Sequence, residues 1–275
     1  MTSEADRDPR PSAGEQRADS EGSVGAEPAA LVSVSWHDRV ALVTLHRPEK
    51  RNALTIELCE LLRDAVAGAL AAEARALVIT GSGSSFCSGA DLDAVYTADF
   101  REALYEMLHT ITEAPLPVIA AVNGPAIGAG TQLALAADLR LVAPSAVFGV
   151  PTAKIGLAVD PWTIRRLALL AGNGVARRLL LACEQLTAEQ ALACGLADRA
   201  GLLADALDWA TPMTELAPLT IGYSKQVLNQ LFEPDLDPFA DKELFDAFEG
   251  CWASDDFAEG RLAREQRRRP RFEGR

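Results

Sequence analysis

The stretch PVIAAVNGPAIGAG, from Pro117 to Gly130, joins an apolar run to a loop of small residues. Pro117 to Val122 predicts a short buried strand, Asn123 to Gly128 a loop, and Ala129 to Ala136 a helix. Small residues between a strand and a helix let a ligand approach the backbone, and the first N–H groups of a helix have no partner within it. The spacing excludes a dinucleotide fingerprint, because GxGxxG would need a glycine at Leu133.

A second unit of this kind precedes the first. Ala76 to Thr80 predicts a buried strand, which runs through a Gly/Ser loop into Phe86–Asp91, FCSGAD. If the two loops face each other, their N–H groups would form an oxyanion hole. The glycines would equally suit tight turns and close helix packing, and spacing alone does not separate the two interpretations. Cys87 has no histidine near it in sequence, which favours an inert residue over a nucleophile.

Strands and helices alternate on both sides of these units. The sequence predicts a hairpin at 32–45, a helix that starts after an N-cap at Thr55, a helix at 99–113, a strand at 139–143, and an almost wholly helical region after Pro161. Such alternation is typical of a mixed α/β fold whose sheet strands are joined by crossover connections.

Composition narrows the functional classes. The 275 residues are 49% apolar, which is enough to bury a large core, and the net charge of −13 disfavours nucleic-acid and membrane-surface binding. No apolar run is long enough for a membrane span. Residues 1–30 are polar and acidic and predict a disordered tail without a signal sequence. Five scattered cysteines and three isolated histidines indicate a reduced, cytoplasmic protein without a metal site.

Several ordered motifs together resemble the crotonase (enoyl-CoA hydratase/isomerase) superfamily. They are RPEKRNAL at 47–54, FCSGADL at 86–92, PVIAAVNGPAIGAG at 117–130, DLRLVAPSAVFGVP at 138–151 and LTAEQALACGL at 186–196. The resemblance implies a ββα-spiral core over residues 31–216 and a C-terminal helical region over 217–275 that builds a trimer, often paired as a hexamer. It also implies an acyl-CoA thioester as ligand and no other cofactor.

The resemblance assigns roles to individual residues. It implies that the N–H groups of Ser88 and Ala129 form the oxyanion hole, although the usual second donor is glycine. A further set of residues would contact coenzyme A: Lys50, Arg51, Ala53, Ala90, Asp91 and Leu92. For Asp91, a role in loop structure is the alternative.

The catalytic positions depart from the family pattern. Hydratases of this family use two glutamates, and here Gln132 and Thr152 stand at those positions. Neither side chain can take up a proton near pH 7, and loss of a positioned acid or base typically costs ~10²–10⁴-fold in rate. Asp160 aligns with an aspartate of dienoyl-CoA isomerase-like members, but Asp160 before Pro161 is also a common helix start.

These departures resemble an actinobacterial subgroup that lacks the hydratase carboxylates and binds long acyl-CoA. The first hypothesis is therefore an acyl-CoA binding protein of lipid metabolism with weak or absent hydratase activity. The alternatives are an isomerase or slow hydratase that uses Asp160, and a scaffold for other lipid-metabolism enzymes. Four apolar residues on one predicted helix are candidates for the acyl pocket, although a core helix face would explain them equally: Phe100, Leu104, Met107 and Leu108.

Overall fold

The computed structural model describes residues 30–91, 97–231 and 242–275. The predicted acidic tail lies outside the described residues, apart from Ala30. Within the described part, no helix is both long and apolar enough to cross a membrane. The same residues contain no group of three His, Cys, Asp or Glu side chains that could hold a metal ion.

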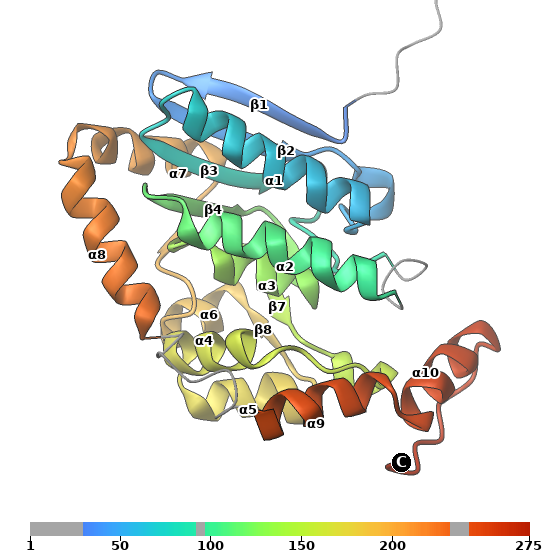
Figure 1. Ribbon diagram of the computed structural model, residues 1–275. Helices are drawn as coiled ribbons and strands as arrows, with labels where there is room; N and C mark the ends of the chain where they lie inside the picture. The colour runs from blue at the N-terminus through green and yellow to red at the C-terminus, as the bar shows by residue number, and fades with distance from the viewer. Residues whose placement is uncertain (1–29, 92–96, 232–241) are drawn as a thin grey trace, which may run out of the picture.

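The main sheet has the strand order β1-β2-β3-β4-β6-β9 (Figure 1). Its strands are β1 (Val32–His37), β2 (Val40–Leu45), β3 (Ala76–Gly81), β4 (Val118–Val122), β6 (Leu139–Val142) and β9 (Arg199–Ala200). β1 and β2 form the predicted antiparallel hairpin, with Val32 opposite Leu45, and every later pair is parallel. The mixed α/β fold class predicted from the sequence is confirmed.

Helices cover both faces of this sheet. α1 (Ile56–Ala71) and α2 (Ala98–Glu113) lie side by side on one face, and α7 (Leu203–Ala210) lies on the other (Figure 1). β3 shows the pattern residue by residue: Leu77 and Ile79 belong to the large core under α1 and α2, whereas Ala76 and Val78 pack toward α7. A parallel strand buried on both faces reads as a continuous apolar run, which explains why β3 is predictable.

A second, smaller sheet holds the loop that the sequence singles out. It comprises β5 (Pro125–Ile127), β7 (Val147–Gly149) and β8 (Gln185–Thr187). Along the chain, α3 (Ala129–Ala136) follows β5, and α6 (Ala188–Cys194) follows β8. The predicted loop at 123–128 therefore contains a three-residue strand. β8 and β9 likewise interrupt the region predicted as helical, because their pairing with β7 and β6 is a long-range contact that local periodicity does not encode.

Local capping signals are confirmed. The Thr55 hydroxyl accepts a hydrogen bond from the Leu58 N–H at 3.1 Å, and Asp160 caps α4 (Pro161–Ala171). The remaining elements are α5 (Asn173–Leu181), α8 (Pro218–Gln230), α9 (Lys242–Trp252), α10 (Asp255–Glu265) and the short 3₁₀ helices η1 (Pro48–Lys50), η2 (Thr152–Ile155) and η3 (Thr211–Glu215).

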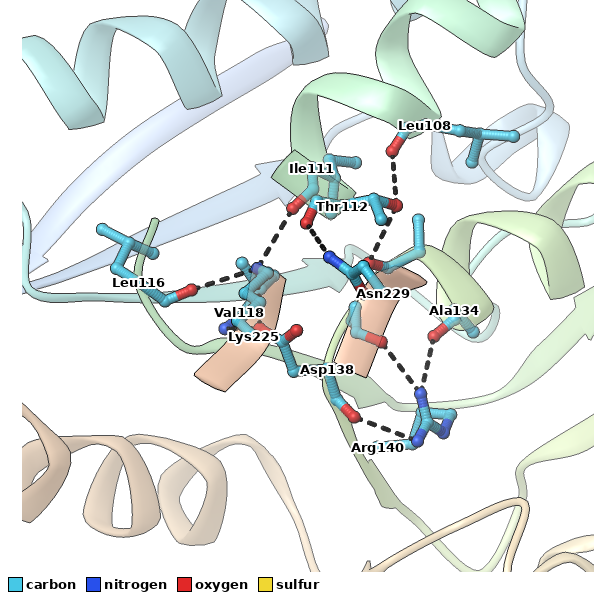
Figure 2. Close-up of polar contacts among 12 residues, drawn as sticks. Leu108, Ile111, Thr112, Leu116, Val118, Ala134, Asp138, Arg140, Lys225 and Asn229 are labelled. Atoms are coloured by element: carbon cyan, nitrogen blue, oxygen red, sulfur yellow. Dashed lines mark hydrogen bonds and ion pairs between the residues drawn. The ribbon is translucent and has the colours of Figure 1, made fainter. Parts of the chain in front are cut away.

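α8 is joined to the core by a buried lysine (Figure 2). The Lys225 Nζ donates to the carbonyl oxygens of Ile111 and Leu116 at 3.4 and 3.1 Å and pairs with the Asp138 Oδ2 at 2.8 Å. One turn further on, the Asn229 side-chain amide donates to the Thr112 carbonyl oxygen at 2.9 Å. α8 is thus attached through polar residues, while several of its large apolar side chains are exposed: Leu219, Tyr223, Val227 and Leu228.

Candidate functional site

Two loops meet at the start of α3. Cys87 and Ala126 form a parallel bridge, in which the Ile127 N–H donates to the Cys87 carbonyl oxygen at 3.0 Å. Gly130 makes this approach possible, because a Cβ there would lie 2.0 Å from the Cys87 oxygen. The predicted facing of the two loops is therefore present, and glycine also serves close packing, as the alternative interpretation held.

Ala129 offers a free N–H to this junction. It is the first residue of α3, and within the described residues its N–H donates to no protein group. The unusual backbone angle falls on Gly128, whose φ is 56°, so the alanine at 129 causes no strain. Unpaired N–H groups at a helix start carry partial positive charge and suit an oxygen that bears negative charge.

The prediction that the Ser88 N–H is one of the two oxyanion-hole donors is wrong. This N–H already donates to the Arg51 carbonyl oxygen at 3.0 Å. The Ala90 N–H is the available one: Leu54 pairs with Gly89 and Asp91 on either side of it, and among the described residues nothing accepts from Ala90 itself. A Cβ at Gly89 would stand 3.7 Å from the Ala129 nitrogen, which places this peptide segment beside Ala129.

A cavity of about 320 Å³ opens beside these N–H groups. Its lining residues come from the two loops, from α2, from the segment around η2 and from α9: Ser88, Gly89, Ala90, Phe100, Arg101, Leu104, Tyr105, Ile127, Gly128, Ala129, Gln132, Pro151, Thr152, Lys154, Ile155, Leu157, Ala158, Val159 and Trp252. Of the predicted acyl-pocket residues, Phe100 and Leu104 line the cavity, whereas Met107 and Leu108 are fully buried in the core. This volume is at the lower end of the range for small-molecule sites.

Gln132 lies on α3, one turn after Ala129, and two hydrogen bonds fix its side-chain amide. The Gln132 Nε2 donates to the Asp160 Oδ2 at 3.1 Å and to the Thr163 Oγ1 at 2.8 Å. Both amide protons are therefore engaged, and the Oε1 is the atom left to accept a hydrogen bond. At this position the cavity wall offers a neutral acceptor.

Asp160 is the N-cap of α4. It is not among the residues that line the cavity. Its Oδ1 accepts from the Thr163 N–H at 3.0 Å, and its Oδ2 accepts from the Thr163 hydroxyl at 2.6 Å in addition to Gln132. The predicted N-cap role is confirmed. Both carboxylate oxygens are occupied by protein donors.

Tyr105 is a site residue that the sequence reading missed. Burial raises the pKa of Tyr105, and the charge of Asp160 and a hydrogen bond to it act in the same direction, so the phenol keeps its proton at neutral pH. The only signal in the sequence is a polar-tipped aromatic beside the apolar face of α2. Thr152 begins η2 and lines the cavity, so Gln132 and Thr152, the two positions predicted to correspond to the family glutamates, border the same space.

The RPEKRNAL loop is held by two of its own side chains, Arg47 and Asn52, whose contacts are partly or fully buried. The Arg47 Nη1 pairs with the Asp91 Oδ2 at 2.7 Å and donates to the Ala53 carbonyl oxygen at 3.0 Å. The fully buried Asn52 donates its amide to the Ser82 and Ser85 carbonyl oxygens at 2.9 and 2.8 Å. Asp91 therefore has the structural role that the alternative gave it.

The cations predicted to contact coenzyme A lie at the surface of this loop. Lys50 and Arg51 are exposed, and within the described part neither has an ion-pair partner. Arg51 is in the left-handed region, with φ 52°, at the end of η1. Leu92 lies outside the described residues.

Residues 36–275 match the family model for enoyl-CoA hydratase/isomerase. The chain belongs to the enoyl-CoA hydratase/isomerase family. It is 47% identical over 245 residues to the probable enoyl-CoA hydratase echA6 of Mycobacterium tuberculosis, which covers 89% of this chain and 100% of the relative.

Solved structures support the same family. An enoyl-CoA hydratase/isomerase from Pseudoalteromonas atlantica T6c has a TM-score of 0.80 at 31% identity and covers 89% of this chain and 100% of its own. A methylmalonyl-CoA decarboxylase in complex with 2-nitronate-propionyl-CoA has a TM-score of 0.83 at 24% identity, and the match covers 90% of this chain and 99% of that one. At this identity the likeness supports the crotonase fold and nothing about function.

Proposed function

We propose that this family member binds an acyl-CoA thioester, with a long acyl chain, and hydrates enoyl-CoA weakly or not at all. One observation carries the proposal: the neutral side chains of Gln132 and Thr152, at the positions that the sequence resemblance assigns to the family glutamates, line the same cavity. The amide of Gln132 is fixed by Asp160 and Thr163 so that it presents an acceptor that cannot take a proton.

In this proposal the thioester carbonyl oxygen accepts hydrogen bonds from the Ala90 and Ala129 N–H groups. These backbone donors keep their positions whether or not chemistry follows, so the oxyanion hole acts as a clamp. Lys50 and Arg51 supply positive charge for the coenzyme A phosphates on a chain whose net charge is −13. Ala53 and Ala90 would offer backbone contacts to coenzyme A.

The alternative is an isomerase that uses Asp160 as its base. Two features weigh against it: Asp160 is not among the cavity-lining residues, and each of its oxygens accepts from a protein donor. A base must reach the proton that it removes, directly or through one water. Asp160 would have to break its contact with Gln132 to do so.

Turnover and binding measured together separate these functions. Purified protein is incubated with crotonyl-CoA and a long-chain trans-2-enoyl-CoA while the enoyl absorbance is followed, and a saturated long-chain acyl-CoA is titrated in parallel. We expect binding without turnover, and Asp160→Asn retains the affinity. Turnover near a typical enzyme rate of roughly 10 s⁻¹, abolished by Asp160→Asn, would establish the isomerase instead.

Restoring carboxylates is the complementary test. Thr152→Glu returns one proton acceptor to the cavity, and we expect it to raise enoyl-CoA hydration above the wild-type rate. Gln132→Glu should give less, because the new carboxylate would stand about 3.1 Å from the Asp160 oxygen and repel it. A double variant without any gain in hydration would show that more than the two side chains is missing.

Gly89→Ala tests the backbone clamp directly. The φ of Gly89 is 105°, and a Cβ would lie 2.7 Å from the Ile127 carbonyl oxygen, so the segment that carries the Ala90 N–H must shift. We expect at least a ~10-fold loss of acyl-CoA affinity, equal to about 1.4 kcal/mol. The matched control is Gly68→Ala on α1, where nothing lies within 4 Å and affinity should not change.

The partner proposed for the C-terminal region is a second copy of the chain, in a trimer or a hexamer. α8 exposes a stripe of apolar side chains: Leu219 is 88% exposed, Tyr223 68% and Leu228 57%. Such a stripe is typical of an interface. Leu219→Asp should lower the mass measured by light scattering to that of a smaller species, whereas an unchanged mass would exclude α8 from the interface.

A further inference from the structure

One wall of the acyl cavity comes from the C-terminal helices. Among the lining residues, Trp252 at the end of α9 is the one that these helices contribute. Arg101 of α2 lines the same cavity, and its guanidinium carbon lies 4.6 Å from the centre of the Trp252 ring. Arg101 therefore touches the side chain that closes this side of the cavity.

Arg101 also fixes α9 through two further contacts. Its Nη1 and Nη2 reach the two carboxylate oxygens of Glu249 at 2.8 and 3.4 Å, and the Phe248 ring centre lies 5.7 Å from the guanidinium. A planar guanidinium can stack flat on a ring while it pairs with both oxygens of a carboxylate, whereas a lysine ammonium is a point charge without planar stacking or a bidentate fork. Arg101 is thus suited to position Trp252.

The indole of Trp252 is held by stacking alone. Its Nε1–H is buried and has no hydrogen-bond partner in the described part of the chain. Its ring contacts the Phe248 ring, at 6.2 Å between centroids, and the Phe257 ring, at 5.5 Å. Because the indole N–H makes no hydrogen bond within the described residues, the side chain can leave its place without breaking one.

The contact between α10 and η2, on the other side of α9 and α10 from Trp252, is packed more tightly. A Cβ at Gly260 of α10 would lie 2.3 Å from the Ile155 carbonyl oxygen, and one at Gly156 would lie 2.7 Å from the Asp256 carbonyl oxygen. Backbone therefore meets backbone between α10 and η2. The Trp252 side chain is the part of this wall that can yield.

We infer that Trp252 determines acyl-chain length and that Arg101 is its positioning residue. Short chains fit in the cavity of about 320 Å³ with Trp252 in place, and longer chains displace the indole at the cost of its stacking on Arg101. Each added methylene that is buried gains hydrophobic free energy, which offsets that cost once the chain is long enough. This inference rests on the proposed acyl-CoA binding function.

The test is the ratio of long-chain to short-chain affinity, measured by calorimetry with butyryl-, octanoyl-, dodecanoyl- and hexadecanoyl-CoA. Arg101→Lys keeps the charge and loses the planar stacking, and we expect it to raise this ratio about 10-fold, or about 1.4 kcal/mol. Glu249→Gln lies outside the cavity lining and should leave butyryl-CoA affinity unchanged while raising hexadecanoyl-CoA affinity less than Arg101→Lys does. The matched control is Arg63→Met, which removes the other α2 ion pair, from Arg63 to Glu106 at 2.8 Å, and should leave the ratio unchanged.

Tryptophan emission gives a second measurement that does not depend on the stability of those variants. Hexadecanoyl-CoA should change the emission of the wild type but not that of Trp252→Phe, and butyryl-CoA should change neither. Equal ratios in all variants, or an emission change independent of chain length, would overturn the inference and leave the proposed function intact. Failure of the wild type to bind any acyl-CoA would overturn both.

Discussion

Asp160 and Asp138 are two carboxylates that hold helices in place by different means. Asp160 begins α4 among neutral partners: the Thr163 N–H, the Thr163 hydroxyl, the Gln132 amide and the Tyr105 phenol. Asp138 anchors α8 through a buried ammonium, Lys225, as Figure 2 shows, and also accepts from the Val118 N–H at 2.8 Å. The first arrangement shapes a binding cavity, whereas the second supports an exposed helix.

The electrostatic consequences differ as well. Burial raises the pKa of Asp138 and lowers the pKa of Lys225, and their mutual attraction opposes both changes without cancelling them. The attraction between the two charges therefore offsets part of the cost of desolvating each of them. If either residue is removed, the other is left as a buried charge without its partner. Neutral donors around Asp160 involve no second desolvated charge, so single substitutions there should cost less.

Lys225→Met should give the largest effect. It leaves the Asp138 carboxylate with the Val118 N–H but without its charged partner, and it removes the Lys225 donor from two carbonyl oxygens. Removal of one partner from a buried pair typically costs about 3–5 kcal/mol of unfolding free energy. Urea unfolding measures the loss, and light scattering tests whether the proposed oligomer depends on the attachment of α8. Arg178→Met, which removes the exposed pair with Glu184, is the control and should cost under about 1 kcal/mol. Equal losses in the two variants would remove the distinction between buried and exposed pairs.

Asp160→Ala should have an intermediate effect. Loss of the cap costs about 1 kcal/mol, and the Gln132 amide loses one acceptor, so we expect a total of about 2 kcal/mol. Asp160→Asn can still accept from the Thr163 N–H and should lose less. If Asp160→Ala cost as much as Lys225→Met in the same urea series, the neutral network would be as indispensable as the charged one.

Glu259 extends the comparison to a partly exposed carboxylate and gives the smallest effect. Hydrogen bonds from Arg268 and from the Arg271 N–H lower the pKa of Glu259 from 4.5 to about 2. A lowered pKa in the folded state means that its stabilisation is complete above pH 4.5 and is lost as the pH falls from there toward 2. Thermal melts of the wild type and Glu259→Gln between pH 5 and 2.5 should converge as the pH falls. Parallel curves would show that Arg268 does not hold this carboxylate in solution.

Features encoded by neighbouring residues were predictable from the sequence, and long-range contacts were not. The caps at Thr55 and Asp160, the hairpin and the strand of β3 follow from local pattern, and the structure confirms them. Ser88 was misassigned because the availability of its N–H depends on Arg51, which belongs to another loop. Tyr105 and Trp252 reach the cavity from α2 and α9, and no spacing in the sequence relates those helices to the loops.

The attachment of α8 also has a temporal consequence during synthesis of the chain. The Lys225 ammonium reaches back over 114 residues to the Ile111 carbonyl oxygen. At ribosomal rates of about 5–20 residues per second, that span takes roughly 6–23 s to be made. Throughout this interval the nascent core presents the carbonyl oxygens of Ile111 and Leu116 without their donor. The end of α2 can therefore reach its final state only after Lys225 has left the ribosome.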